Sequence, residues 1–271
     1  MDEVTVDEWL SYAKSWATHA GAMIQEARNL ADFSEQYKSE HELVTSTDLA
    51  VDDYLCRQIK QTFPDHLILS EESSPDLALV QKSDVPVWVI DPIDGTINFA
   101  QGLLYVAVSI AVLYQGERWV GVVHAPFLNQ TFSAIKGQGA WLNGEEIHVS
   151  KRSDIRNAIV ATGFPYDKTA LPQLMHSLGS VLASCQDIRR NGSAALDLCA
   201  VASGVIDAYY ETVKPWDMAA GALIANEAGA LVGSYTPQND SWPSAINGHC
   251  LLVAPPDLYH SLLDVLQLSK I

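Results

Sequence analysis

Two spacings of apolar residues divide the first half of the chain into helices and strands. Apolar positions recur every three or four residues from Asp7 to Phe33, which predicts a long helix with one buried face. A second helix is predicted after Asp48 and ends before Pro64. The polar segment 35–42 between the two helices is predicted to be a hairpin or a mobile loop.

Short apolar runs then predict a sheet. The runs 66–69 and 85–90 are bounded by turn residues and are too short for isolated helices, so each is predicted to be a strand. The second run is rich in β-branched and aromatic residues, as a central strand requires. Further strands are predicted at 105–114, 118–123 and 131–135. Asn143-Gly144 is the strongest hairpin signal in the chain.

The second half begins near Ser150 and alternates strands with helices. Strands are predicted at 158–162 and 206–210, and helices at 171–183, 192–204 and 218–227. This alternation predicts an α/β (α+β) fold. Because no Pro- or Ser-rich linker divides the chain, we expect one compact domain over residues 1–271, with subdomains of about 1–149 and 150–271.

Composition narrows the classes of partner. The chain has 271 residues, of which 48% are hydrophobic, so it can bury a full core. Its 16 basic and 33 acidic residues give a net charge of −17, which weighs against direct binding of nucleic acid or an anionic membrane. No basic and apolar leader or bilayer-length apolar run is seen, and the four cysteines show no Cys-x-x-Cys spacing. We therefore expect a cytoplasmic protein.

The stretch from Asp91 to Thr96 carries the most distinctive chemistry. Asp91 and Asp94 follow the predicted central strand, and Pro92 between them cannot extend a hydrogen-bonded ladder. We therefore expect the chain to leave the sheet there, with both carboxylates facing one cleft. Gly95 permits close approach to a ligand, and a helix starting at Thr96 would offer free N–H groups to an anion. The alternative is an ordinary turn, because Asp-Pro and Asp-Gly are common turn formers.

Further acidic positions fit the same site. Glu71 and Glu72 end the strand 66–69, and pairing of that strand with the next one in register would bring Glu71 beside Asp91. Asp48 and Asp217 each stand at the start of a predicted helix. Each of these two aspartates could equally serve as a helix cap alone.

Four motifs in this order resemble the inositol monophosphatase family along nearly the whole chain. They are Leu43-Val44-Thr45-Ser46-Thr47-Asp48, Glu71-Glu72, Asp91-Pro92-Ile93-Asp94-Gly95-Thr96-Ile97-Asn98-Phe99 and Trp216-Asp217-Met218-Ala219-Ala220-Gly221. The segments 137–144 and 192–194 are also similar to parts of that family. The resemblance implies a layered αβαβα sandwich, a homodimer and a lithium-sensitive, magnesium-dependent phosphatase.

The resemblance also implies a role for individual residues. Two or three magnesium ions would be held by Glu71, Asp91, the carbonyl of Ile93, Asp94 and Asp217. Thr96 and Asp48 would orient the attacking water, with help from Glu71. The substrate would contact the Gly95 and Thr96 amides through its phosphate, and Gly192, Ser193, Ala194, Glu211 and Asp217 through its alcohol part. Lys38 matches a loop lysine that closes near the metals.

Three departures from the family pattern concern the substrate side. Ser70 stands where a glycine is common before the acidic pair. The spacing from Glu211 to Asp217 is one residue shorter than expected. Phe164-Pro165-Tyr166-Asp167 is similar to bacterial members, and we expect it to shape the substrate cleft.

The predicted chemistry is hydrolysis of a small phosphate monoester by metal-activated water, without a covalent intermediate. Inositol 1-phosphate is the first candidate substrate, and NADP, fructose 1,6-bisphosphate, nucleotide 3′-phosphates and histidinol phosphate are the alternatives. The chain shows no Ser/His/Asp elbow and no Cys-x5-Arg loop, which argues against other phosphatase and hydrolase types. A different class, a regulatory binding protein, stays open, because some bacterial relatives join transcription complexes. A calcium-binding structural protein is disfavoured by the lack of an EF-hand loop.

Overall fold

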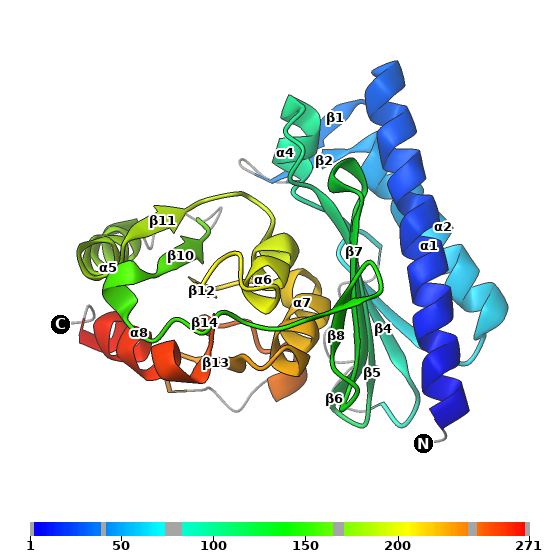
Figure 1. Ribbon diagram of the computed structural model, residues 1–271. Helices are drawn as coiled ribbons and strands as arrows, with labels where there is room; N and C mark the ends of the chain where they lie inside the picture. The colour runs from blue at the N-terminus through cyan, green and yellow to red at the C-terminus, as the bar shows by residue number, and fades with distance from the viewer. Residues whose placement is uncertain (1–2, 39–41, 74–82, 165–170, 238–242, 269–271) are drawn as a thin grey trace.

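The computed structural model describes residues 3–38, 42–73, 83–164, 171–237 and 243–268. The chain forms five layers, in which helices and sheets alternate (Figure 1). This is the layered αβαβα arrangement that was predicted. Within the described residues, no helix combines the length and hydrophobicity that crossing a bilayer requires.

A seven-stranded sheet forms the second layer. Its order is β3-β4-β5-β6-β7-β8-β9, where β3 is parallel to β4 and the other neighbours are antiparallel. Asn143 and Gly144 both have positive φ between β8 and β9, which confirms the predicted hairpin turn. The strands are β3 (Leu67–Ser70), β4 (Val87–Asp94), β5 (Ala107–Tyr114), β6 (Glu117–Ala125), β7 (Gln130–Ile135), β8 (Ala140–Leu142) and β9 (Glu145–Ile147).

A five-stranded mixed sheet forms the fourth layer. Its order is β11-β10-β12-β14-β13, and β10 is parallel to both of its neighbours. The boundary of the two predicted subdomains near residue 150 falls between the two sheets, and it stays a prediction. The strands are β10 (Ile159–Thr162), β11 (Asp187–Arg189), β12 (Ala208–Glu211), β13 (Leu231–Ser234) and β14 (Leu251–Ala254).

Helices make the other three layers (Figure 1). The first layer is α1 (Glu3–Leu30) and α2 (Ser46–Thr62), the middle layer is α6 (Ala194–Ala202) and α7 (Pro215–Glu227), and the outer layer is α5 (Leu171–Ser184) and α8 (Pro256–Leu268). The short elements among the described residues are α4 (Thr96–Gln101), a hairpin of β1 (Glu35–Tyr37) and β2 (Leu43–Thr45), and three 3₁₀ turns at Pro126–Leu128, Ile155–Asn157 and Ser244–Ile246.

The middle layer is apolar on all sides because sheets cover it from both directions. Ten residues of α7 are buried, which explains why its sequence lacks a polar face. Two glycines allow the close packing. A methyl group at Gly121 would lie 2.8 Å from the carbonyl oxygen of Ala220, and one at Gly221 would lie 2.8 Å from Cβ of Leu198.

Three expectations need correction or completion. The chain does not leave the sheet after Asp91, because β4 continues to Asp94. Asp91 pairs with Ser109 and Asp94 with Ala107, so β4 carries one extra residue in a bulge, where proline is tolerated.

The cap of α2 is Thr45 and not Asp48. Residues 35–37 of the segment 35–42 form β1, which pairs with β2, whereas residues 39–41 lie outside the described residues, as do 165–167 of the predicted cleft segment.

Candidate metal and phosphate site

Three carboxylates from distant parts of the chain meet at one point. Glu71, Asp91 and Asp217 each offer an oxygen within 4.8 Å of the other two. Glu71 directly follows β3, and its N–H donates to the carbonyl of Ile90 at 3.2 Å. The parallel pairing of β3 and β4 therefore sets Glu71 beside Asp91, as the strand ends predicted. Asp217 reaches the same point from the first turn of α7.

The three carboxylates disturb one another electrostatically. Burial and then the charge of Glu71 raise the pKa of Asp91 well above its ordinary value. Burial, followed by the charges of Asp94 and Glu71, does the same to the pKa of Asp217. Burial raises the pKa of Glu71 to about 7. A set of crowded oxygen donors that resist ionisation fits a hard divalent cation such as Mg²⁺, which would neutralise them.

Asp94 lies beside this group and is tied to the next layer. Its Oδ2 accepts hydrogen bonds from Ser193 Oγ at 2.6 Å and from the Ala195 N–H at 2.7 Å. Burial raises its pKa to about 6, although these hydrogen bonds act in the opposite direction. The two carboxylates of the bulge thus have different surroundings, because Asp91 faces other acids and Asp94 joins the start of α6.

Thr96 and Asp48 form the hydroxyl–carboxylate pair that the family resemblance implied. Thr96 Oγ1 is 3.0 Å from Asp48 Oδ1 and 3.1 Å from the carbonyl oxygen of Ile93. Asp48 Oδ2 accepts from the N–H of Thr45 at 2.8 Å and from the Thr45 hydroxyl. Asp48 is therefore the N3 partner of the Thr45 cap in the capping box of α2, and it also contacts the candidate site.

The two glycines of the predicted substrate contacts touch each other. Gly95 has φ +99° and Gly192 has φ +90°, which other residues adopt only with strain. A methyl group on Gly95 would lie 3.0 Å from the Tyr105 carbonyl oxygen and 3.3 Å from that of Gly192. The predicted phosphate turn and the predicted alcohol-contacting segment are therefore packed backbone to backbone.

Glu211, at the end of β12, is held by residues that the sequence analysis did not single out. Its Oε2 accepts from the Tyr209 hydroxyl at 2.5 Å, and a methyl group at Gly163 would overlap its carboxylate. Burial raises its pKa to about 7, while the Tyr209 hydrogen bond and the charge of Arg190 lower it. Arg190 lies 5.5 Å from the ring centre of Phe164. Among these neighbours of Glu211, Phe164 belongs to the segment expected to shape the substrate cleft, and that expectation stays a prediction.

Lys38 at the β1–β2 hairpin reaches the acidic group. Its Nζ is 3.2 Å from Glu71 Oε1 and 2.5 Å from Glu72 Oε1. Burial lowers the pKa of Lys38, but the charges and hydrogen bonds of these two glutamates raise it above its ordinary value. Lys38 therefore pairs with two acids next to the candidate site, and its expected closing near the metals stays a prediction.

The end of β3 has one further support that sequence reasoning missed. Ser70, which is fully buried, donates from its hydroxyl to Asp52 Oδ1 on α2. Asp52 lies four residues after Asp48, so a helix places both on one face. That spacing was the available signal for a second acid beneath the site.

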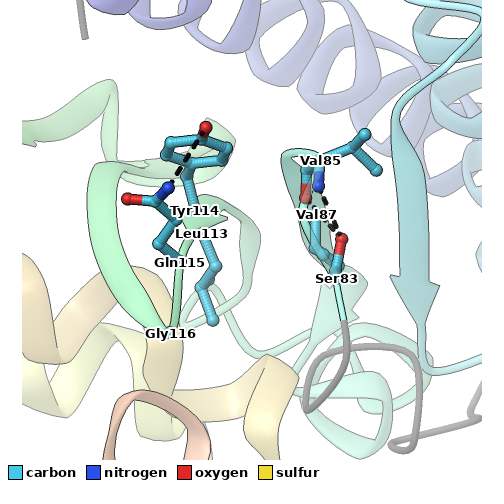
Figure 2. A pocket seen from close by; sticks show the side chains of 7 residues that line it. All are labelled: Ser83, Val85, Val87, Leu113, Tyr114, Gln115 and Gly116. Carbon is cyan, nitrogen blue, oxygen red and sulfur yellow. Dashed lines mark hydrogen bonds between the residues drawn. The ribbon is translucent and has the colours of Figure 1, made fainter.

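A small surface hollow lies far from these acids. It is lined by Ser83, Val85, Val87 and the turn 113–116 (Figure 2). Val87 begins β4, whereas Asp91 and Asp94 lie toward its end. The hollow is therefore no part of the candidate site.

Comparisons with known proteins agree with the geometry. The model of the inositol monophosphatase family matches residues 5–267. The Nus factor SuhB of Pasteurella multocida is 40% identical over 238 residues, which cover 87% of this chain and 86% of that protein. Inositol monophosphatase 3 of Solanum lycopersicum is 38% identical over 232 residues, 84% of this chain and 86% of that protein.

A solved structure extends the likeness to the whole fold. The extragenic suppressor protein SuhB of Bartonella henselae has a TM-score of 0.87 and 29% identity, and the match covers 96% of this chain and 98% of that one. Motif order, layer order and overall match lead to the same assignment. The chain belongs to the inositol monophosphatase family.

Proposed function

We propose that this protein is a magnesium-dependent phosphatase of small phosphate monoesters, with inositol 1-phosphate as its first candidate substrate. The observation that carries the proposal is the group of Glu71, Asp91 and Asp217, whose oxygens lie within 4.8 Å of one another beside the Thr96–Asp48 pair. Membership of the inositol monophosphatase family supports the reaction class. The name of the tomato relative supports the choice of substrate.

Two or three magnesium ions would be held by the three carboxylates, with the carbonyl of Ile93 and the carboxylate of Asp94 as further ligands. Bound magnesium would neutralise the phosphate, acidify water and stabilise the departing alkoxide. Asp94 keeps one oxygen on Ser193 and Ala195, so it would connect cation binding to the position of α6.

The chain's own residues orient the reactants. Thr96 Oγ1 donates to Asp48 Oδ1, which leaves the hydroxyl oxygen free to accept a hydrogen bond from the attacking water. Because Thr45 holds the second oxygen of Asp48, the pair is rigid, and Glu71 would help to orient the water. The amides of Gly95 and Thr96 would bind the phosphate, and Gly192, Ser193, Ala194 and Glu211 would contact the alcohol, near Asp217. None of these roles requires a covalent intermediate.

A substrate panel tests the proposal. Phosphate release would be measured from inositol 1-phosphate, NADP, fructose 1,6-bisphosphate, a nucleotide 3′-phosphate and histidinol phosphate, with and without Mg²⁺ and Li⁺. We expect Mg²⁺-dependent release that is fastest for inositol 1-phosphate and inhibited by Li⁺. Turnover of NADP without turnover of inositol phosphate would overturn the substrate choice, and no release from any monoester would overturn the enzyme assignment.

A regulatory binding role is the second candidate, and the name Nus factor carried by a relative of 40% identity favours it. The variant Asp91→Asn separates the two functions better than a change at Asp94 would. Asp91 belongs to the acidic group, whereas Asp94 also accepts a hydrogen bond from the start of α6. Cells that depend on this protein and keep their phenotype with Asp91→Asn would favour the regulatory role. Loss of the phenotype with a folded variant would favour catalysis.

The proposal includes a cytoplasmic homodimer, which the family resemblance supports. Light scattering coupled to size-exclusion chromatography measures the oligomeric state. A monomer at micromolar concentration would contradict this part of the proposal without affecting the chemistry.

A further inference from the structure

A buried carboxylate lies outside the acidic group and has no part in the proposed chemistry. Asp197 on α6 is 2% exposed, and its Oδ1 accepts from the Tyr105 hydroxyl at 3.0 Å and from Asn191 Nδ2 at 2.7 Å. Within the described part of the chain it makes no ion pair with a lysine or arginine. Burial raises its pKa to about 7. An acid buried without a cation costs stability, so its two neutral partners deserve an explanation.

Asn98 connects Tyr105 and Asn191, the two partners of Asp197, through their backbone carbonyls. The Nδ2 group of Asn98, a residue that is 5% exposed, donates to the carbonyl of Tyr105 and to the carbonyl of Asn191, each at 2.8 Å. Four side chains thus connect two segments that are more than ninety residues apart in sequence. One segment runs from α4 to Tyr105, and the other from Asn191 into α6.

These two segments carry the two halves of the predicted substrate contacts. Gly95 precedes α4, and Gly192 precedes α6. Their backbones are in contact, because a methyl group on Gly95 would meet the carbonyls of Tyr105 and Gly192. The network of Asn98, Tyr105, Asn191 and Asp197 therefore lies next to this contact. A change in the network would alter the spacing between the phosphate turn and the alcohol-contacting segment.

We propose that Tyr105 and Asp197 are positioning residues that fix this spacing and thereby set the affinity for phosphate monoesters of a polyol. The inference rests on the proposed phosphatase function. A rigid spacing matters because an alcohol and its phosphate must be held together in one geometry, and small displacements weaken binding strongly. A substrate that makes few contacts with the alcohol-contacting segment is bound mainly by the phosphate turn. Its affinity should therefore not depend on the spacing between the turn and that segment.

The test compares two substrates in matched variants. Tyr105→Phe removes one hydroxyl and keeps the ring, so it should raise KM for inositol 1-phosphate about fivefold, the effect of one hydrogen bond. Its kcat, and its KM for p-nitrophenyl phosphate, should stay within about twofold of the wild type. Asp197→Ala should raise KM for inositol 1-phosphate at least as much. Asp197→Asn should stay within about twofold, because its amide oxygen can accept both hydrogen bonds.

Controls separate positioning from general destabilisation. Tyr114→Phe removes the hydroxyl that accepts from Gln115 Nε2 at 3.4 Å, at the end of β5 distant from Tyr105, and should leave both KM values unchanged. Magnesium binding by calorimetry should be equal in the wild type and Tyr105→Phe. An unchanged KM for inositol 1-phosphate in Tyr105→Phe, or an equal rise for both substrates, would overturn this inference alone. A wild type that hydrolyses no monoester would overturn the proposed function, and this inference with it.

Discussion

The two sides of the candidate site are built differently. On the metal side, backbone geometry places the acids: adjacent parallel strands bring Glu71 to Asp91, and a helix start adds Asp217. On the alcohol side, side chains hold one another: Tyr209 supports Glu211, and Asp197 supports Asn191. The metal side therefore depends on the fold as a whole, whereas the alcohol side depends on individual hydrogen bonds. Substitutions on the two sides should have effects of different size and kind.

The largest effect is expected for Asp91→Asn. Loss of this carboxylate removes a proposed metal ligand, so kcat/KM should fall on the order of 10³-fold or more. The thermal midpoint should not fall, because one of the crowded charges disappears. Phosphate release and circular dichroism measure the two quantities. Asp53→Asn, in an exposed ion pair on α2, is the matched control and should keep full activity. Near-normal turnover in Asp91→Asn would reject the metal side as the site.

Thr96→Ala should have the next largest effect. In the proposed mechanism its hydroxyl donates to Asp48 and positions the attacking water, so kcat should fall roughly 10- to 100-fold. Affinity for Mg²⁺, measured by calorimetry, should stay close to that of the wild type. Loss of Mg²⁺ binding would show that Thr96 supports the cations and not the water.

Glu211→Gln tests the alcohol side. The amide can still accept from Tyr209 but lacks the charge for polyol hydroxyls, so KM for inositol 1-phosphate should rise about five- to tenfold. The kcat for p-nitrophenyl phosphate should be unaffected. A loss of kcat for both substrates as large as that of Asp91→Asn would remove the distinction between the two sides.

The smallest effect concerns stability against pH in the absence of divalent cations. The pKa of Glu71 is raised from 4.5 to about 7 in the folded protein, so the folded state keeps a proton that the unfolded state has already lost. The stability that this proton contributes is present below about pH 4.5 and is lost as pH rises to about 7. Urea unfolding should show this decline in the wild type relative to Glu71→Gln. Added Mg²⁺ should restore the wild type, and parallel pH profiles without Mg²⁺ would contradict the assignment.

Much of the metal side could be predicted because its signals are local. Strand ends, a proline between two acids and helix starts are visible in a few neighbouring residues, and the strand register brings Glu71 to Asp91 as expected. The bulge at Pro92 was missed because a proline can leave a sheet or sit in a bulge, and only pairing with β5 decides between them.

The alcohol side was harder to predict because its contacts span long separations. Asp94 reaches Ser193 across 99 residues, and Tyr105 reaches Asp197 across 92. No spacing rule connects such pairs before the layers are assembled. The strands β11, β13 and β14 and the helix α8 also received no prediction.

The position of Asp217 on a helix enclosed by two sheets limits how this chain can change. One residue of an α-helix corresponds to a rotation of about 100°. A single insertion or deletion that shifted the register of α7 would therefore turn Asp217 away from Glu71 and Asp91, or would turn polar Asn226 and Glu227 toward apolar surroundings. We therefore expect changes of length to be tolerated in the connection before Pro215, where the chain is partly exposed. The rotational phase of one buried helix is thus as strict a requirement for the site as the identity of its acids.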